Sequence, residues 1–232
     1  MLVSVILPTY NESGNIVPLV RAIQENMPQG VDFEILVVDD NSPDGTYPLV
    51  RDTFQGDARV VPVLRTTDRG FAKSIRAGIE QARGDQILVM DTDFTHDPVE
   101  IPRLLHVAKV YDLVSGSRFC PGGRMQDTRH YLSSLLYNWV LRVILRTQIQ
   151  DNLGGYFTVN RAALEGVPFD IVFRGYGEYY FRLLYFLQRR RRSVVELPAS
   201  YLVRSAGKSK SRFFKMFFTY MWSAISLRVK GR

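Results

Sequence analysis

The chain of 232 residues (26.6 kDa) contains 46% hydrophobic and 23% charged residues. This composition is typical of one folded domain and excludes a disordered, collagen-like or disulfide-rich chain. The net charge of +7 is unevenly distributed. Residues 1–100 contain 8 basic and 16 acidic side chains, a net charge of −8, and residues 101–232 contain 22 basic and 7 acidic side chains, a net charge of +15. The first half therefore suits the binding of a cation, and the second half that of a polyanion or an anionic membrane.

The first half of the chain alternates apolar runs with stretches whose apolar residues are three and four positions apart. The predicted strands are 2–7, 34–38, 60–64 and 86–90, and the predicted helices are 15–26, 47–54 and 71–82. Alternating strands and helices predict an α/β fold, a mostly parallel sheet with helices on both faces. Ligands of such sheets bind beyond the carboxyl ends of the strands, so the polar residues after each run are the candidates for function.

The second half is less regular. The pattern predicts strands at 113–117, 154–159 and 193–197 and helices at 129–146, 176–192 and 211–228. Residues 1–10 lack a basic leader and predict a buried strand instead of a signal peptide. No stretch reaches about 18 charge-free apolar residues, so no spanning helix is predicted. With one cysteine, Cys120, an internal disulfide is excluded, and we expect the protein to remain on the cytosolic side.

Two carboxylates follow the predicted strand 86–90, in the sequence Asp91-Thr92-Asp93. At i and i+2 of a turn, both can approach one hard divalent cation, and Mg²⁺ and Mn²⁺ prefer such oxygen ligands and share them with substrate phosphates. The alternative is an acidic turn that binds no metal, because this short pattern also arises by chance.

Asp39 and Asp40 follow the strand 34–38 in the same way. A carboxylate at this edge can accept hydrogen bonds from a base or from ribose hydroxyls. The alternative, compatible with the first, is a turn followed by a helix cap, with Asp44 and Thr46 as capping residues. Neither of the glycine-rich dinucleotide and P-loop phosphate motifs is present, so those two nucleotide folds lose their main support.

Nine segments in order carry a resemblance to a known family. They are VSVILPTYNE, ILVVDDNSPDGT, RTTDRGFAKSIRAGIEQARGD, DTDFTHDP, LVSGSR, RHYLS, DNLGGYFTVNR, GYGEYYFRLL and VVELPASYLVRSAGKSK. From residue 2 to about 212 the chain resembles the family 2 glycosyltransferases with a GT-A fold, and within them the dolichyl-phosphate mannosyltransferase branch. The resemblance implies one catalytic domain, with a Rossmann-like nucleotide-sugar and metal half at about 2–117, an acceptor half at about 118–210, and an amphipathic interfacial helix at about 211–228.

The resemblance also implies residue roles. Asp91 and Asp93 would hold Mg²⁺ or Mn²⁺ and, with Arg118, would be catalytic. The nucleotide sugar would be bound by Pro8, Tyr10, Glu12, Asp39, Asp40, Asp91, Thr92, Arg204 and Lys210, and the acceptor phosphate by Arg118, Arg129 and Ser133. The metal segment departs from the common D-A-D-L-Q-H-P-P by placing Thr95 where relatives have glutamine. The segment RSAGKSK also holds Lys208, which leaves open the choice of lysine.

The implied reaction is the inverting transfer of mannose from GDP-mannose to dolichyl (polyprenyl) phosphate, which yields dolichyl β-D-mannosyl phosphate and GDP. The alternatives are a polyprenyl-phosphate glucosyltransferase or other hexosyltransferase that uses a UDP-sugar, and transfer to a sugar hydroxyl, against which the predicted arginines argue. Nucleic acid is not an expected partner, because no groove-entering helix or stacking platform is evident. Asp151 and Glu178 are expected either to contact acceptor or sugar or to orient an arginine.

The resemblance and the charge pattern place the protein peripherally at the cytoplasmic face of a membrane, with a small membrane-anchoring subunit as a further possible partner. The arginine run 189–192 suits anionic headgroups, nucleic acid or a solvated helix end. The helices 211–228 and 129–146 suit the bilayer interface, the core or a partner subunit.

Overall fold

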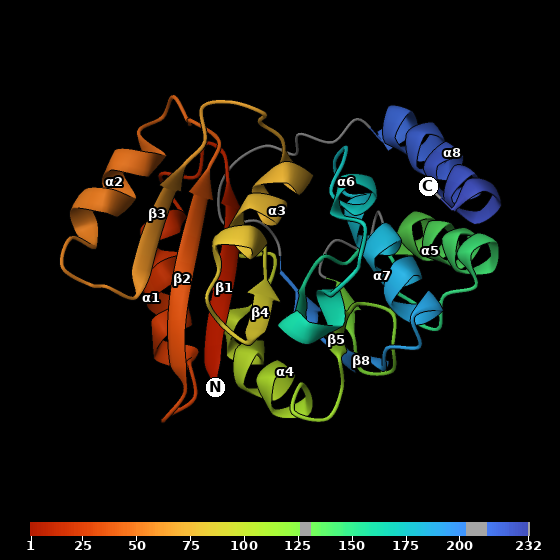
Figure 1. Cartoon of the computed structure of the whole chain (residues 1–232), viewed down its shortest axis with the longest axis horizontal. Helices are drawn as coiled ribbons and strands as arrows, with labels where there is room; N and C mark the ends of the chain where they lie inside the picture. The colour runs from red at the N-terminus through yellow and green to blue at the C-terminus, as the bar shows by residue number, and fades with distance from the viewer. Residues whose placement is uncertain (126–130, 203–212, 232) are drawn as a thin grey trace.

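The computed structural model describes residues 1–125, 131–202 and 213–231 (Figure 1). The first half contains β1 (Leu2–Thr9), α1 (Ile16–Asn26), β2 (Asp32–Asp39), α2 (Thr46–Thr53), β3 (Val60–Leu64), α3 (Phe71–Gln81), β4 (Gln86–Val89), η1 (Pro98–Glu100), α4 (Ile101–Val107) and β5 (Leu113–Ser117). The second half contains β6 (Arg124–Met125), α5 (Tyr131–Leu145), β7 (Phe157–Asn160), η2 (Arg161–Leu164), α6 (Phe169–Val172), α7 (Tyr179–Arg189), β8 (Val194–Pro198), β9 (Ser200–Tyr201) and α8 (Phe213–Lys230).

The central sheet has seven strands in the order β3-β2-β1-β4-β7-β5-β8, and β6 pairs with β9 in a small second sheet. Within the central sheet β7 is antiparallel to both neighbours and the other pairs are parallel. Thr9 lies beside Asp39, and Asp39 beside Leu64, so β1, β2 and β3 end at one edge. The mostly parallel α/β sheet predicted from the sequence is confirmed.

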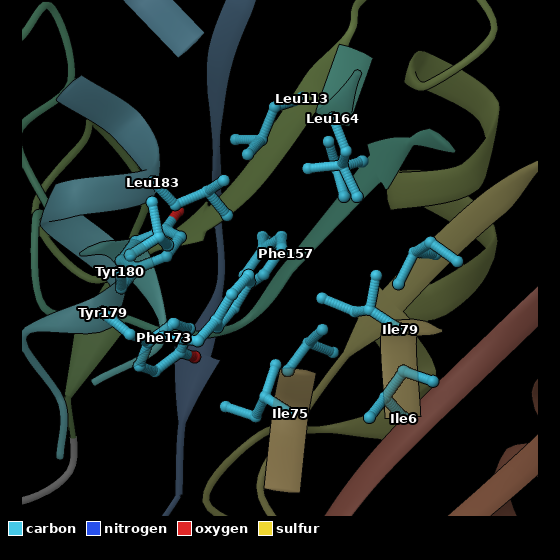
Figure 2. Close-up of a cluster of buried hydrophobic side chains, with 14 of the residues drawn as sticks. Ile6, Ile75, Ile79, Leu113, Phe157, Leu164, Phe173, Tyr179, Tyr180 and Leu183 are labelled. Carbon is cyan, nitrogen blue, oxygen red and sulfur yellow. The ribbon is translucent and has the colours of Figure 1, made fainter. Parts of the chain in front are cut away.

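Helices cover both faces of the sheet because its central strands are apolar on both sides. On one face, α1, α2 and α4 pack on residues such as Val5 and Val37. On the other, α3 and α7 pack on the strand residues that alternate with these, such as Ile6. Figure 2 shows this second cluster, in which Ile75 of α3 and Tyr180 of α7 lie on either side of Phe157 of β7.

A third layer lies outside α7. Helices α5 and α8 run side by side there (Figure 1) and bury Leu141 and Ala224 in a cluster with Phe181 and Tyr185 of α7. Helix α7 is therefore enclosed between the sheet and the α5–α8 pair, which explains why it is the most thoroughly buried helix of the chain that the structure describes.

Several elements differ from the sequence prediction, which lacks the short elements η1, β6, η2, α6 and β9 and starts β7 at 154 instead of Phe157. Two further differences concern longer helices. Helix α4 was not predicted, because its seven residues are too few to show a period and carry proline at the second position. Helix α7 begins at Tyr179 instead of 176. Its expected first turn is a separate turn instead, in which Gly175 has φ +79 and the Glu178 carboxylate accepts the Tyr176 N–H at 2.9 Å.

Candidate active site

A cavity of about 430 Å³ opens beyond the carboxyl ends of β1 and β4. Its volume is in the range of small-ligand sites. The residues predicted to bind the nucleotide sugar that line it are Pro8, Tyr10, Glu12, Asp40, Asp91 and Thr92, and Asp93 lines it as well. Segments more than 80 residues apart in the sequence therefore meet in one cavity, as expected for the end of a parallel sheet.

The acidic turn after β4 is held in shape by its own side chains. The Oδ1 of Asp93 accepts the Thr95 N–H at 3.1 Å and the Thr95 hydroxyl at 2.6 Å. The next residue, Phe94, has φ +62 and packs against the core under α1 and α4. A bulky residue at positive φ is strained, so core packing maintains this turn in a conformation that the local sequence does not favour.

The donor set of this turn fits a hard divalent cation. Asp91 and Asp93 both line the cavity, and their carboxylate oxygens are the ligands that Mg²⁺ and Mn²⁺ prefer. Within the described ranges no cluster of three or more His, Cys, Asp and Glu side chains is positioned to enclose a metal. Proteins commonly bind Mg²⁺ through one or two carboxylates, while phosphate oxygens and water molecules fill the remaining coordination positions.

His96, which is fully buried, holds the acidic turn by a hydrogen bond. Its Nδ1 accepts the Asp91 N–H at 2.9 Å, and its ring stacks on Tyr156 and meets Tyr201 edge-on, with both centroid distances 4.8 Å. Burial lowers the pKa of His96 to about 4, although the nearby charge of Asp93 acts to raise it. The ring is therefore neutral at pH 7. A neutral imidazole can accept the backbone hydrogen bond that fixes Asp91.

The loops after β1 and β2 are tied to each other. Backbone N–H groups of the first loop donate to side chains of the second: Asn11 to Ser42 at 2.9 Å, Glu12 to Thr46 at 3.1 Å and Ser13 to Asp44 at 3.0 Å. The N-cap of α2 is Gly45, at φ +81, and not Asp44 or Thr46 as the sequence suggested. Asp44 instead precedes the cap, and its Oδ1 accepts the Thr46 N–H at 3.1 Å. These bonds fix the wall of the cavity that carries Tyr10 and Glu12.

Asp39 and Asp40 have different surroundings. Asp39 is fully buried and does not line the cavity; its carboxylate accepts the Ser42 N–H at 2.8 Å and the Ser42 hydroxyl at 2.5 Å. Asp40 does line the cavity, forms an ion pair with Arg65 and accepts the Gly70 N–H at 2.7 Å. Asp39 thus shapes the loop, whereas Asp40 joins the cavity wall to the loop after β3.

Further cavity residues were not among the predicted site residues: Arg69, Gly70, Phe71, Ser74 and Tyr176, with Thr9. The guanidinium of Arg69 lies over the Tyr10 ring at 5.1 Å, a cation–π contact at the mouth of the cavity. Phe71 and Tyr176 pack with ring centroids 5.0 Å apart. All six lie in segments that carry the family resemblance, VSVILPTYNE, RTTDRGFAKSIRAGIEQARGD and GYGEYYFRLL, but nothing local in these segments indicates that these side chains face the cavity.

Arg118 follows β5 and is held by Asp151. Its Nε and Nη2 donate to the two carboxylate oxygens at 2.8 and 2.7 Å, and its guanidinium lies 4.9 Å from the Tyr201 ring centre. Burial opposes the charge, but Asp151 more than offsets it, with smaller contributions from Tyr201 and Asp91, so the pKa of Arg118 lies above its ordinary value. Arg118 is thus a permanent cation that Asp151 orients, and Tyr201 connects it to the acidic turn, because the Tyr201 ring also meets His96 edge-on.

Glu178 also orients an arginine. Its carboxylate lies 3.5 Å from the Arg182 guanidinium and accepts the Tyr176 N–H. Both side chains are almost completely buried. Burial lowers the pKa of Arg182 to about 10, and Glu178 opposes this shift, so Arg182 is charged at pH 7. The two side chains together hold the turn that carries Tyr176.

Helices α5 and α8 expose a broad apolar surface, here named the α5–α8 face. It consists of Leu132, Leu136, Trp139 and Val143 of α5 and Phe218, Trp222, Ile225 and Val229 of α8, each at least 42% exposed. Both sets have spacings of four, three and four residues, one stripe per helix. Because both helices bury their opposite sides with α7, the two stripes share the outer side of the molecule.

No helix in the described part of the chain is long and apolar enough to cross a membrane.

The predicted acceptor residues are only partly within the described ranges. Ser133 lies exposed near the start of α5, and Arg118 lies beside the acidic turn as described above. Arg129, Arg204 and Lys210, together with Lys208, lie outside the described residues.

Comparison with known proteins places this site in a family. Dolichol-phosphate mannosyltransferase of Pyrococcus furiosus is 32% identical over 228 residues, covering 95% of this chain, which spans 62% of that relative's length. Polyprenol monophosphomannose synthase of Mycolicibacterium smegmatis is 36% identical over 214 residues, covering 89% of this chain and 79% of the relative. Undecaprenyl-phosphate mannosyltransferase of Micrococcus luteus is 32% identical over 216 residues, covering 90% and 87%.

Solved structures agree on the fold. Glucosyl-3-phosphoglycerate synthase from Mycobacterium tuberculosis, in complex with Mn²⁺, UDP and phosphoglyceric acid, superposes with a TM-score of 0.76 and 18% identity over 98% of this chain and 78% of its own. The sequence model of "Glycosyl transferase family 2" matches residues 4–167. The chain therefore belongs to glycosyl transferase family 2 and has the GT-A fold.

Proposed function

We propose that this protein transfers mannose from GDP-mannose to a polyprenyl phosphate such as dolichyl phosphate, with inversion, giving the β-mannosyl phosphate lipid and GDP. The observation that carries the proposal is the position of the acidic turn. Asp91 and Asp93 line the cavity. Arg118 lies behind the same turn, because its guanidinium contacts Tyr201, whose ring meets His96, the residue that accepts the Asp91 N–H. An anionic donor in the cavity and an anionic acceptor at Arg118 would then share this turn. Two relatives are mannosyltransferases of dolichol phosphate and undecaprenyl phosphate and a third is a polyprenol monophosphomannose synthase, which supports both the sugar and the lipid.

The chemistry needs placement more than proton transfer. An oxygen of the acceptor phosphate attacks the anomeric carbon, the bond from that carbon to the diphosphate oxygen breaks, and the electron pair leaves with GDP. Because the acceptor phosphate is already ionised near neutral pH, no general base is required. Arg118, fixed by Asp151, would hold the attacking phosphate in line. A divalent cation bound by Asp91 and Asp93 would neutralise charge on the leaving diphosphate.

We propose further that the α5–α8 face lies on an anionic membrane surface, which gives access to the lipid acceptor. Neither helix contains an acidic residue. The exposed basic side chains Arg142, Arg228 and Lys230 lie in the last part of each helix. Apolar side chains next to basic ones fit the boundary between acyl chains and anionic headgroups.

Calorimetry with GDP, GDP-mannose, UDP and UDP-glucose, with Mn²⁺ and after chelation, tests the donor site. We expect metal-dependent guanosine binding, followed by mannosyl transfer to dolichyl phosphate in detergent. A uridine preference would assign the protein to the UDP-sugar alternative, and no nucleotide binding at all would refute the proposed site.

Tryptophan fluorescence tests the membrane proposal. The chain has two tryptophans, and both, Trp139 and Trp222, lie on the α5–α8 face. Vesicles of anionic phospholipid should shift their emission to the blue. Unchanged emission and no flotation with vesicles would instead favour a protein subunit as the occupant of this face.

A further inference from the structure

Helix α8, in the outer layer beyond α7, holds the turn that carries Tyr176. The Gly177 N–H donates to the Tyr220 hydroxyl of α8 at 2.8 Å. The contact is tight, because a Cβ added at Gly177 would lie 2.7 Å from that oxygen. Tyr220 is only 4% exposed, so its hydroxyl cannot exchange this bond for one to bulk water without opening the helix contact.

A second connection runs through Arg182. Its Nε and Nη2 donate to the Ser223 hydroxyl of α8 at 3.1 and 2.7 Å, while its Nη1 donates to the Arg174 carbonyl at 2.6 Å. Arg182 also pairs with Glu178, whose carboxylate accepts the Tyr176 N–H. Both ends of the turn 174–178 are therefore fixed, one by Tyr220 and the other by Ser223 through Arg182.

The same turn forms part of the cavity wall. Tyr176 lines the cavity and packs against Phe71, which also lines it. None of the α8 residues 217–230, whose side chains the structure describes, lines the cavity, and the opposite side of this helix belongs to the exposed α5–α8 face. A continuous set of contacts thus leads from that face through Tyr220 to the cavity.

We propose that Tyr220 and Ser223 are positioning residues of the donor cavity: through them α8 holds the turn 174–178 and sets the position of Tyr176 against the bound nucleotide sugar. The inference rests on the proposed function, because it takes the cavity as the nucleotide-sugar site. It extends that function by making a helix of the membrane-facing layer part of the donor site.

The test is the substitution Tyr220→Phe, which removes one hydroxyl and keeps the packed ring. Loss of one such hydrogen bond should weaken nucleotide binding about three- to tenfold, measured calorimetrically with Mn²⁺ and the nucleoside diphosphate that the wild-type protein binds. Tyr137→Phe is the matched control, because it also removes one hydroxyl and keeps a packed ring. The Tyr137 hydroxyl joins α5 to α8 by donating to the Phe217 carbonyl at 3.0 Å, whereas that of Tyr220 accepts from the turn. It should keep wild-type affinity at a similar loss of thermal stability. Ser223→Ala is the second variant, for use if Tyr220→Phe does not fold.

A double-mutant cycle distinguishes positioning from a general loss of stability. If Tyr220 acts through Tyr176, then Tyr176→Ala alone should weaken nucleotide binding, and adding Tyr220→Phe should weaken it no further. Additive effects, or folded Tyr220→Phe and Ser223→Ala proteins with the affinity of the Tyr137→Phe control, would overturn the inference and leave the proposed function intact. Absence of nucleotide binding by the wild-type protein would instead overturn the proposed function and the inference with it.

Discussion

The guanidinium of Arg118 and the carboxylate of Asp151 form a two-point ion pair, with Nε–Oδ2 and Nη2–Oδ1 distances of 2.8 and 2.7 Å. Asp151 is held in turn by Glu196 of β8, which accepts the N–H groups of Gln150 and Asp151 at 2.7 and 2.9 Å. The orientation of the proposed acceptor-binding arginine therefore depends on a buried carboxylate 33 residues further along the chain.

Asp151→Asn should damage this arrangement in two ways. The substitution leaves Arg118 as a buried charge without its counter-ion, a change that costs on the order of 3–5 kcal/mol of unfolding free energy. It should also raise the KM for polyprenyl phosphate more than the Kd for GDP, because the arginine loses its two-point support. Chemical denaturation and steady-state kinetics measure the two effects.

The control for this substitution is Asp112→Asn, in an ion pair with Arg192 that is partly exposed and 4.0 Å long. Exposed pairs contribute at most about 1 kcal/mol, and this one lies away from the cavity. An Asp151→Asn protein with unchanged acceptor KM would show that Arg118 does not depend on Asp151 for its role, or does not bind the acceptor.

Asp93→Asn should abolish transfer while leaving the fold intact. The amide oxygen can still accept both hydrogen bonds from Thr95, so the turn is retained, but the cation loses a charged ligand. We expect a loss of activity of at least about a hundredfold, as for other removals of transition-state charge stabilisation, together with loss of Mn²⁺-dependent GDP binding.

Asp97→Asn is the matched control, because Asp97 belongs to the same segment but caps Val99 at 3.0 Å and is not among the cavity residues. It should retain transfer. Near-wild-type transfer by Asp93→Asn, with Mn²⁺ still required, would remove Asp93 from the metal site.

Much of the sheet was predictable because each strand carries its own signal. The predicted strands 60–64 and 113–117 match β3 and β5 residue for residue. The first is an apolar run that a polar segment follows, and the second begins with Leu113 and Val114 and continues in small residues up to Arg118. The metal candidates Asp91 and Asp93 were recognisable for the same reason: they follow such a run directly, and the ends of parallel strands share one edge.

The rest depends on contacts between distant segments. Nothing local to Arg118 indicates that Asp151 neutralises it, and nothing near Gly177 indicates a hydrogen bond to Tyr220, 43 residues away. The conformation of Phe94 is likewise imposed by core packing against its local preference. Asp39 and Asp40 are neighbours in the sequence, yet only Asp40 lines the cavity, because Asp39 bonds back to Ser42 while Asp40 bonds to the loop after β3.

Glu34→Gln should lower stability without affecting the site. Glu34 is 2% exposed, accepts hydrogen bonds from Ser4 at 2.6 Å and from the Arg83 N–H and Nε at 2.6 and 2.8 Å, and lies near the amino-terminal ends of the strands. We expect a loss on the order of 1–3 kcal/mol at pH 7, measured by urea denaturation, with nucleotide affinity unchanged.

The pH dependence of Glu34 gives a sharper version of this prediction. Burial acts to raise the pKa of Glu34, but the hydrogen bonds from Ser4 and Arg83 outweigh it, so the pKa lies below its ordinary value of 4.5. The unfolded chain therefore binds the proton first as the pH falls, and the stabilisation is present above about pH 4.5 and lost below it. The difference between wild type and Glu34→Gln should shrink from pH 7 to pH 3. Glu80→Gln, at a partly exposed pair with Arg76, is the control and should change the free energy of unfolding at pH 7 by at most about 1 kcal/mol.

Trp222→Ser and Leu136→Ser should each weaken binding to anionic vesicles while leaving the free energy of unfolding almost unchanged. Both side chains are exposed, at 72% and 63%, so the folded protein loses little packing. On a bilayer each would be buried, and full burial of such a side chain is worth about 1.5–3 kcal/mol, or about ten- to a hundredfold in affinity.

Val110→Ser is the control, because Val110 is 78% exposed but lies after α4, outside the α5–α8 face. Co-sedimentation with vesicles measures the effect. Equal losses for all three variants would indicate non-specific adsorption, whereas no loss for Trp222→Ser and Leu136→Ser would show that the bilayer does not contact these two helices.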